Sequence, residues 1–434
     1  MKKLLVTILD IESRLILKKY RPFIVAVTGS VGKTSTKDAI FSVFKGQSIY
    51  ARKSEKSMNS ELGLPLTIIG APNAWHSLSG WLENIFQGLE AILWHVEYPD
   101  CLILEIGADH PGDISRVTRW LKPDIAVITL VSQTPVHVEF FPTPEDVFKE
   151  KSALARAVKK GGTLVLFADD EKVMTLAPEA LKSGVLVKTY GMNAQADARG
   201  SEYAPVYAES QVNQVSVSAL VGMSFKLDIE GNSIPITING AVGSPYVYSL
   251  LAAVAAGRAR GFAISNIVQG LTDFHAPNGR MNVISGINGS TIIDDSYNSS
   301  PDAAESALNT LKSLQCSGHK IAVLGDMLEL GKFSSDEHKR IGKLALESAD
   351  VLITVGQRFK TSFEVSPVDR KIKSFDNSTE ASEYVKSVVK AGDIILIKGS
   401  QSTRMERVSA ALLKEPGRAS ELLVRQEKEW LEKK

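Results

Sequence analysis

The segment Thr28–Ser35, Thr-Gly-Ser-Val-Gly-Lys-Thr-Ser, has the residue types of a phosphate-binding loop. It follows an apolar, β-branched stretch over Phe23–Val27 and precedes apolar residues at helical spacing over Lys33–Phe44. A strand, a glycine turn and a helix in this order direct backbone N–H groups and a helix N-terminus to one point, which suits a phosphate. Lys33 would reach the outer phosphates, and Thr34 would offer its hydroxyl to Mg²⁺.

The segment departs from the full phosphate-loop pattern at one position. That pattern has another glycine five residues before Gly32, where this chain has Val27. An ordinary glycine turn between a strand and a helix is the alternative interpretation. Phosphate binding is favoured, because the strand and the helix lie where the motif requires them. The residues of the candidate nucleotide loop are Thr28, Gly29, Ser30, Val31, Gly32, Lys33, Thr34 and Ser35.

Three further side chains could take part in chemistry near this loop. Glu105 lies at the end of the apolar segment Cys101–Ile106. Ligands of doubly wound sheets bind at the carboxyl ends of the strands, so Glu105 is a natural Mg²⁺ ligand, or else an acid that caps the next turn. On the residues alone, His137 in a loop and Lys151 in a helix are typical of solvated side chains.

An alternation of strands and helices supplies the framework for these residues. The predicted strands of the first part are Phe23–Val27, Cys101–Ile106, Ile125–Leu130 and Thr163–Phe167. This rhythm predicts an α/β fold with a mostly parallel sheet covered by helices on both faces. A long apolar helix is predicted over Leu78–Val96, with Trp81 and Trp94 used for packing. Alternating residues over Val206–Ile238 predict a small antiparallel section, and a helix follows over Leu250–Arg260.

A second α/β series begins after the turn at Pro277–Arg280. Its predicted strands are Thr291–Asp294, Lys320–Leu324, Val351–Val355 and Ile394–Ile397, and its predicted helices include Asp302–Leu314 and Asp336–Leu346. We expect an N-terminal helix over 1–22, a nucleotide-binding domain over 23–282 and a Rossmann-like domain over 283–434. A charged helix is predicted over Ala419–Lys434.

The composition is that of an ordinary globular protein. The chain has 434 residues, with 44% hydrophobic and 23% charged residues, which suits two or three domains. A net charge of +1 predicts no strong attraction to nucleic acid or acidic lipid. The two cysteines, Cys101 and Cys316, are interpreted as thiols of a reducing cytoplasm.

The first twenty residues begin like a signal peptide, with two lysines and an apolar run. Asp10, Glu12 and Arg14 interrupt that run, and the segment is too short and too charged to span a bilayer. An amphipathic helix packed on the next domain is favoured, and a helix on a membrane surface is the alternative. We expect a cytoplasmic protein, monomeric and without a transmembrane segment.

Several motifs stand in the order found in the Mur ligase family, and those around Asn59, Asp295, Asp326 and Lys398 resemble its MurF branch. They are the loop Thr28–Ser35, Asn59-Ser60-Glu61-Leu62-Gly63-Leu64-Pro65, the strand ending in Glu105, His137-Val138-Glu139, Lys151, Asp294-Asp295-Ser296-Tyr297-Asn298-Ser299-Ser300-Pro301, Leu324-Gly325-Asp326-Met327-Leu328-Glu329-Leu330-Gly331 and Lys398-Gly399-Ser400. The resemblance covers nearly everything from residue 23 to about 410.

This resemblance implies an ATP-dependent amide ligase. A substrate carboxylate attacks the γ-phosphate of ATP to give an acyl phosphate and ADP, and an amine then displaces the phosphate. For the MurF branch, the expected reaction joins D-alanyl-D-alanine or a similar dipeptide to a UDP-N-acetylmuramoyl peptide in peptidoglycan precursor synthesis. The expected partners are therefore small-molecule substrates, with no nucleic acid.

The resemblance also assigns roles to residues at the triphosphate. It implies two Mg²⁺ ions, with Thr34 and Glu105 holding one and His137 helping to hold the second. Lys151 matches a lysine that the family carbamylates, which would turn an ammonium into an anionic oxygen ligand. Lys33 would neutralise charge on the transferring phosphoryl group.

Arg280 matches an arginine that reaches the γ-phosphate from the domain junction. Asp295 matches an acid near the ribose or phosphates, and Tyr297 lies beside it in sequence. The carboxylate substrate is expected near Asn59 and Ser60. The amine substrate is expected near Asp326, Lys398, Gly399 and Ser400, for which simple turn chemistry is an equal alternative.

The chain departs from the family pattern in three places. MurF enzymes begin with a domain that grips UDP, whereas only about twenty residues precede the first strand here, so this grip is expected to be missing or supplied in another way. The asparagines that face adenine in the family are absent from Gly243–Ser249, so adenine is expected to stack on a tyrosine. Ser60 replaces an asparagine of its motif, and Ser132-Gln133 stands where an asparagine is common.

Two other functions stay open on the sequence. The same fold and reaction could serve a carboxylate substrate without UDP, as the short N-terminal segment suggests. The chain could also bind a nucleotide without ligating, as a partner of cell-wall enzymes, which the altered adenine segment suggests.

Overall fold

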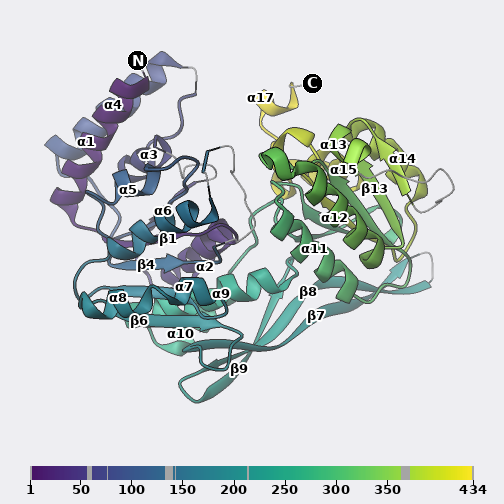
Figure 1. The fold of residues 1–434 in the computed structure, drawn as a ribbon, viewed down its shortest axis with the longest axis horizontal. Coiled ribbons are helices and arrows are strands. Elements are labelled where there is room, and N and C mark those ends of the chain that lie inside the picture. Colours follow the sequence, from purple (N-terminus) through teal and green to yellow (C-terminus); the bar gives the residue numbers. More distant parts are fainter. Residues whose placement is uncertain are drawn as a thin grey trace.

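The computed structural model describes residues 2–55, 61–75, 77–131, 140–141, 143–212, 215–362 and 372–432. It contains two α/β units, each built on its own sheet, with the helices α1 (Lys2–Tyr20) and α4 (Leu78–Leu93) at the end of the first unit that is remote from the second (Figure 1). The mixed α/β class, mostly parallel with one antiparallel section, agrees with the sequence prediction.

The central sheet has the strand order β2-β3-β1-β4-β5-β6-β7-β8-β9. The strands are β1 (Phe23–Thr28), β2 (Ala51–Lys53), β3 (Cys101–Glu105), β4 (Ile125–Ile128), β5 (Thr163–Phe167), β6 (Leu186–Gly191), β7 (Ala198–Val212), β8 (Val215–Ile229) and β9 (Asn232–Asn239). Neighbours from β2 to β7 pair in parallel, and β7, β8 and β9 pair antiparallel. The inner strands β3, β4 and β5 are buried along their whole length, because helices cover both faces.

Helices of the central unit begin and end close to the predicted positions where the sequence is strongly periodic. Besides α1 and α4, they are α2 (Lys33–Lys45), α3 (Gly63–Ile69), α5 (Asp113–Val117), α6 (Pro144–Arg156), α7 (Glu171–Met174), α8 (Ala177–Lys182), α9 (Ser244–Arg260) and α10 (Ile264–Thr272). Helix α9 begins six residues before the predicted Leu250, because Pro245 occupies its first turn, where proline is well tolerated.

The C-terminal sheet has the order β10-β11-β15-β12-β13-β14. Its strands are β10 (Asn282–Ser285), β11 (Thr291–Asp295), β12 (Lys320–Gly325), β13 (Val351–Val355), β14 (Ile372–Phe375) and β15 (Ile394–Lys398), and its helices are α11 (Pro301–Ser313), α12 (Ser334–Ser348), α13 (Gln357–Ser362), α14 (Ser378–Val388), α15 (Glu406–Leu412), α16 (Ala419–Leu422) and α17 (Lys428–Leu431). Among the described strands of this sheet, β10 alone runs antiparallel to its neighbour, which is β11. The long hairpin of β7 and β8 extends toward this unit (Figure 1), where the Tyr207 hydroxyl accepts a hydrogen bond from the Gln315 N–H.

The single charged helix predicted over Ala419–Lys434 is wrong. The structure has the short helices α16 and α17, separated by an extended Leu423 and by Arg425 with a φ of 59°. Leu423 and Val424 are buried, and Arg425 is paired with Glu406. Packing of these side chains breaks the helix, since a continuous helix could not bury all three together.

The N-terminal helix packs as predicted. Val6, Leu9 and Ile16 of α1 are buried, and α1 contacts α3 and α4. The packing role expected of Trp94 is wrong, since this side chain is 63% exposed just after α4. Within the described ranges, none of the helices combines the length and the apolar character needed to cross a bilayer.

Candidate active site

The loop between β1 and α2 is fixed by the exit of the neighbouring strand β4. The N–H groups of Ser30 and Val31 both donate to the carbonyl oxygen of Leu130, and the Thr129 hydroxyl donates to the carbonyl oxygen of Val31 at 2.7 Å. Gly29 has a φ of 152°, and a Cβ there would lie 1.8 Å from the Thr129 Oγ1. Glycine is therefore required at this position.

The loop presents donors that suit an anion. Gly32 precedes α2 with a φ of 84°, and none of the side chains that the structure describes caps the N-terminus of that helix. The buried Ser30 hydroxyl has no hydrogen-bond partner among the described residues. A buried hydroxyl without a partner is costly, and so is a helix end without a cap, so the loop is suited to receive a phosphate.

The half-buried Lys33 and the buried Lys151 both lie at this loop. Burial lowers the pKa of the Lys33 ammonium; Arg280 adds to the shift, whereas Glu105 and Asp109 oppose it. The Lys151 ammonium donates to the carbonyl oxygen of Gly29 at 2.9 Å and is 4% exposed. Its pKa is lowered to about 7, first by burial and then by Lys33. Two neighbouring ammonium groups with little exposure favour a bound anion at this loop.

Glu105 reaches the same place from β3. Val27 at the end of β1 is paired with Glu105 in the parallel register, so the carboxylate lies at the strand edge where the loop begins. Its side chain is buried, and its backbone N–H donates to the Ser54 hydroxyl. The structure therefore brings Lys33, Glu105 and Lys151 together at the loop.

Arg280 adds a third cation from the junction of the two domains. Its Nη2 donates to the Thr34 Oγ1 at 3.5 Å, and its guanidinium carbon lies 4.3 Å from the centre of the Tyr297 ring. The Tyr246 hydroxyl donates to the carbonyl oxygen of Arg280, which ties the junction to α9. Arg280 and Tyr297 thus face the phosphate loop from the side of the C-terminal domain.

Asp295 and Lys398 form a buried ion pair in the C-terminal domain. The two residues are register partners on β11 and β15, and the Lys398 Nζ donates to the Asp295 Oδ2 at 2.6 Å. Burial raises the pKa of Asp295, while Lys398 and Arg280 act against that shift. The Lys398 ammonium also donates a hydrogen bond to the carbonyl oxygen of Asn298, so it binds the segment from Asp295 to Asn298 at two points.

Arg425 is a residue of this region that the sequence did not single out. It donates to the carbonyl oxygens of Ser296 and Tyr297 and to the Glu406 Oε2. Its guanidinium also lies 5.7 Å from the Tyr297 ring centre. Arg425 therefore holds the segment that carries Asp295. No sequence signal marked it, because it lay within the predicted charged helix.

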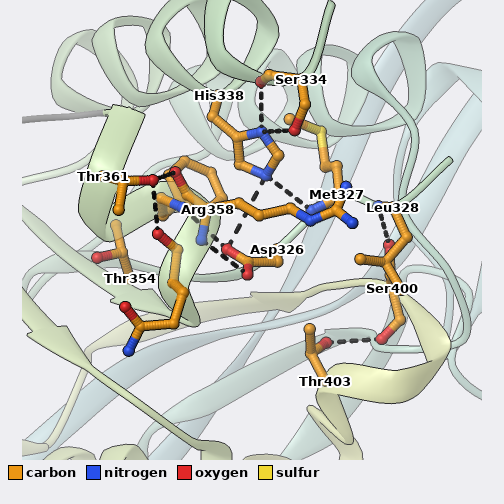
Figure 2. Close-up of polar contacts among 12 residues, drawn as sticks. Asp326, Met327, Leu328, Ser334, His338, Thr354, Arg358, Thr361, Ser400 and Thr403 are labelled. Atoms are coloured by element: carbon orange, nitrogen blue, oxygen red, sulfur yellow. Dashed lines mark hydrogen bonds and ion pairs between the residues drawn. The ribbon is translucent and has the colours of Figure 1, made fainter. Parts of the chain in front are cut away.

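Figure 2 shows how Asp326 and Ser400 hold a loop of the C-terminal domain. The Asp326 carboxylate accepts hydrogen bonds from the N–H groups of Arg358 and Phe359 at the start of α13. The Ser400 hydroxyl accepts from the Leu328 N–H at 2.9 Å, and its own N–H donates to the Asp326 carbonyl oxygen. Both side chains therefore have the turn chemistry that the sequence left open, and a substrate contact stays a prediction.

His338 completes the support of this loop. It is fully buried, its Nε2 accepts from the Met327 N–H at 2.9 Å, and its Nδ1 lies 2.6 Å from the Ser334 carbonyl oxygen (Figure 2). These two contacts require the neutral ring with its proton on Nδ1, and burial lowers its pKa accordingly. Gly399 lies beneath the same loop, where a Cβ would come within 2.6 Å of Met405 and Thr403.

A pocket of about 120 Å³ opens beside the phosphate loop. Val31 and Gly32 line one side, Tyr248 and Ser249 of α9 line another, and Asp302 of α11 closes it from the C-terminal domain. Tyr248 packs edge-on against Phe167, with ring centres 4.7 Å apart. Tyr246, the other tyrosine of this segment, is buried and faces the domain junction instead.

The predicted residues His137, Asn59 and Ser60 lie outside the described residues. In the part of the chain that the structure does describe, no group of three or more His, Cys, Asp or Glu side chains could hold a metal. Of the expected metal ligands, Thr34, Glu105 and Lys151 meet at the loop.

Comparison with known proteins agrees with this geometry. Residues 84–257 match the Mur ligase middle domain, and residues 279–401 match the glutamate ligase domain of Mur ligases. The chain belongs to the Mur ligase family. It is thus an ATP-dependent ligase of the Mur type, as its motifs indicated.

Its relatives are longer than this chain. It is 27% identical over 397 residues to the UDP-N-acetylmuramoyl-tripeptide–D-alanyl-D-alanine ligase of Bacillus subtilis (strain 168), covering 91% of this Mur ligase and 76% of the relative. The corresponding ligase of Mycobacterium leprae (strain TN) is also 27% identical, with coverages of 90% and 73%. The MurF ligase of Thermotoga maritima, solved with ADP, superimposes with a TM-score of 0.75 at 25% identity, covering 95% of this chain and 84% of that one.

Proposed function

We propose that this Mur ligase joins a dipeptide of the D-alanyl-D-alanine type to a UDP-N-acetylmuramoyl tripeptide at the expense of ATP. One observation carries the proposal. Lys33, Glu105 and Lys151 lie together at one phosphate loop, and Arg280 reaches the same loop from the domain junction. The relatives in Bacillus subtilis and Mycobacterium leprae are ligases of this specificity. The reaction would take place on peptidoglycan precursors in the cytoplasm.

ATP would bind with its phosphates on the loop and its base in the neighbouring pocket. The phosphate oxygens would accept hydrogen bonds from the Ser30 hydroxyl, from the N–H groups at the N-terminus of α2 and from the Lys33 ammonium. Tyr248 lines this pocket and Tyr246 does not, so Tyr248 is the tyrosine on which adenine would stack. The related Thermotoga enzyme was solved with ADP.

Magnesium would supply charge neutralisation at the triphosphate. Thr34 and Glu105 would hold one ion, and His137 with Lys151 would hold a second. The Lys151 amine, with its pKa near 7, is partly neutral at physiological pH. A neutral amine can attack the carbon of CO₂, forming an N–C bond and releasing a proton, and the resulting carbamate would be an anionic oxygen ligand.

The two domains divide the work on the substrates. The carboxylate of the tripeptide would attack the γ-phosphorus, giving an acyl phosphate and ADP, and the dipeptide amine would then attack the acyl carbon and release phosphate. Arg280 contacts Thr34 from the C-terminal side. Closure of the domains would therefore place its positive charge beside the phosphoryl group and exclude water from it. We place the dipeptide near Asp326, Gly399 and Ser400 and the tripeptide near Asn59 and Ser60.

The test is ADP and phosphate release with each substrate omitted in turn. We expect release only when ATP, UDP-N-acetylmuramoyl tripeptide and D-alanyl-D-alanine are all present, with the pentapeptide product seen by mass spectrometry. Turnover on a peptide acid without UDP, and none on the UDP-linked acid, would reject the proposed substrate but keep the ligase. Nucleotide binding without turnover on any acid and amine pair would reject the ligase activity.

A further inference from the structure

Helix α4 exposes its large apolar side chains and buries its small ones. Leu78, Leu82, Phe86, Leu89 and Leu93 are all exposed, with Phe86 at 67%. The residues that α4 buries are Asn84, Gly88 and Ala91. At 100° per residue, the five exposed side chains fall within one stripe about 80° wide. A helix whose apolar stripe is on the outside lacks the partner for which that stripe is suited.

Helix α1 extends this apolar surface. Its Leu4, Ile11 and Leu15 are exposed and lie along one side of the helix. Ten of the sixteen exposed large hydrophobic residues in the described part of the chain lie on α1, on α4 or next to α4. We use the term α1–α4 face for Leu4, Ile11, Leu15, Leu78, Leu82, Phe86, Leu89 and Leu93. Figure 1 places both helices side by side at the edge remote from the C-terminal domain.

The two helices form a fixed, parallel pair. The Lys19 ammonium donates to the carbonyl oxygens of Ala91 and Ile92 at 2.9 and 3.0 Å, and the Tyr20 hydroxyl donates to Ala91 at 3.0 Å. The C-terminal ends of α1 and α4 are therefore joined. Further along the pair, the Glu12 carboxylate lies against Gly88, where a Cβ would come within 2.3 Å of its oxygen. The face is thus preformed.

The α1–α4 face has edges of opposite charge. The exposed cations Arg14 and Lys18 lie on the side of α1 away from α4, where Arg14 stacks over Trp120 at 5.5 Å and Asp10 is close by. The exposed acids Glu83 and Glu90 flank the apolar stripe on the outer side of α4. A strip with a basic edge and an acidic edge is complementary to a second copy of itself.

We propose that two copies of this chain associate through the α1–α4 face. A twofold axis parallel to the helices lays α1 of one copy over α4 of the other, so that each basic edge meets an acidic edge. Lys18 and Glu90 both lie near the joined C-terminal ends, so they would be opposite each other across the axis. This dimer replaces the monomer expected from the sequence, and it leaves the domain junction at the far end free to close.

A bilayer fits the same face less well. Glu83 and Glu90 would lie at the level of the headgroups, where anionic lipids repel acids. Opposite charges along two edges of a strip instead favour a protein partner whose edges carry the reverse order.

The experiment is sedimentation velocity on the full 434-residue chain. We expect a species of twice the chain mass of 47.1 kDa. The double variant Leu82→Asp and Phe86→Asp should weaken association about tenfold or more, because buried aromatic and aliphatic anchors dominate interfaces. Leu181→Asp is the matched control, since Leu181 is 59% exposed on a remote helix and Leu82 is 58% exposed.

Charge reversal tests the symmetry. Lys18→Glu and Glu90→Lys should each weaken the dimer, and the two together in one chain should restore it. Loss of the dimer in the combined variant would overturn the proposed axis. A wild-type monomer at tens of micromolar would overturn the dimer, and flotation of that monomer with anionic phosphatidylglycerol vesicles, abolished by Leu82→Asp and Phe86→Asp, would assign the face to lipid.

Discussion

The Lys151 ammonium donates a 2.9 Å hydrogen bond to the carbonyl oxygen of Gly29, so α6 reaches directly beneath the phosphate loop. The contact joins two segments that are 122 residues apart in the chain. It places a buried amine, with a pKa near 7, beside the site where a triphosphate would bind. Sequence proximity could not have revealed this relationship.

Replacing Lys151 should therefore lower the catalytic activity more than it lowers the stability of the fold. We expect Lys151→Ala to lower kcat at least about 100-fold, since the residue proposed to hold a metal is removed, with partial recovery on adding short carboxylates that fill its place. Lys149→Ala, on the exposed face of the same helix, should retain activity. Full activity of Lys151→Ala would show that the lysine has only a structural role.

The pocket beside the loop predicts an effect on ATP binding. Tyr248→Ala should raise KM for ATP by about fivefold, because an aromatic stack contributes on the order of 1 kcal/mol, with little change in KM for the amine. Tyr248→Phe keeps the ring and should stay close to wild type. Steady-state kinetics with ATP varied provides the comparison. Equal KM values for the alanine and phenylalanine variants would place the base elsewhere.

The Asp295–Lys398 pair predicts a large loss of stability when one partner is removed. Lys398→Met leaves a buried carboxylate unpaired, so we expect a fall of about 3–5 kcal/mol in the free energy of unfolding in urea. The exposed pair Lys360–Asp376, at 2.8 Å, provides the matched control. Lys360→Met should cost under about 1 kcal/mol. Similar losses in both variants would contradict the structural role of Lys398.

Glu12 predicts a dependence of stability on pH. Its carboxylate oxygens are buried without a partner among the described residues, and burial raises its pKa from 4.5 to about 7. The folded chain favours the neutral acid, so its contribution is complete below pH 4.5 and is lost as the pH rises to 7. Glu12→Gln should raise stability at pH 8 by about 1–2 kcal/mol, a value reduced to allow for solvent screening, and leave it unchanged at pH 4.

Thermal unfolding between pH 4 and pH 8 measures this effect. For a chain of 434 residues it corresponds to a shift of about 1–2 °C in Tm, because the entropy of unfolding grows with chain length. Glu383→Gln, at an exposed position on α14, is the control and should change Tm only slightly at both pH values. A Glu12→Gln variant that follows the wild-type pH profile would show that the carboxyl is ionised within the fold.

Much of the fold could be predicted because its signals are local. The strand over Thr163–Phe167 and the strand over Val351–Val355 begin and end where the apolar runs do. The prediction failed at the C-terminal end, where burial of Leu423 and the ion pair of Arg425 override the local preference for a helix. Long-range packing of this kind leaves no periodic trace in the sequence.

The sequence by itself determined the order of the motifs, the phosphate loop, and hence the family, since glycine, lysine and threonine at fixed spacing act through one turn of backbone. Only the tertiary structure decided which residues meet. It brought Lys151 into hydrogen-bond contact with Gly29 and paired Lys398 with Asp295. It also showed that Tyr248, and not Tyr246, lines the pocket. It also left an apolar strip of α1 and α4 outside, because which face of a helix is covered depends on its neighbours in space and not on its neighbours in the chain.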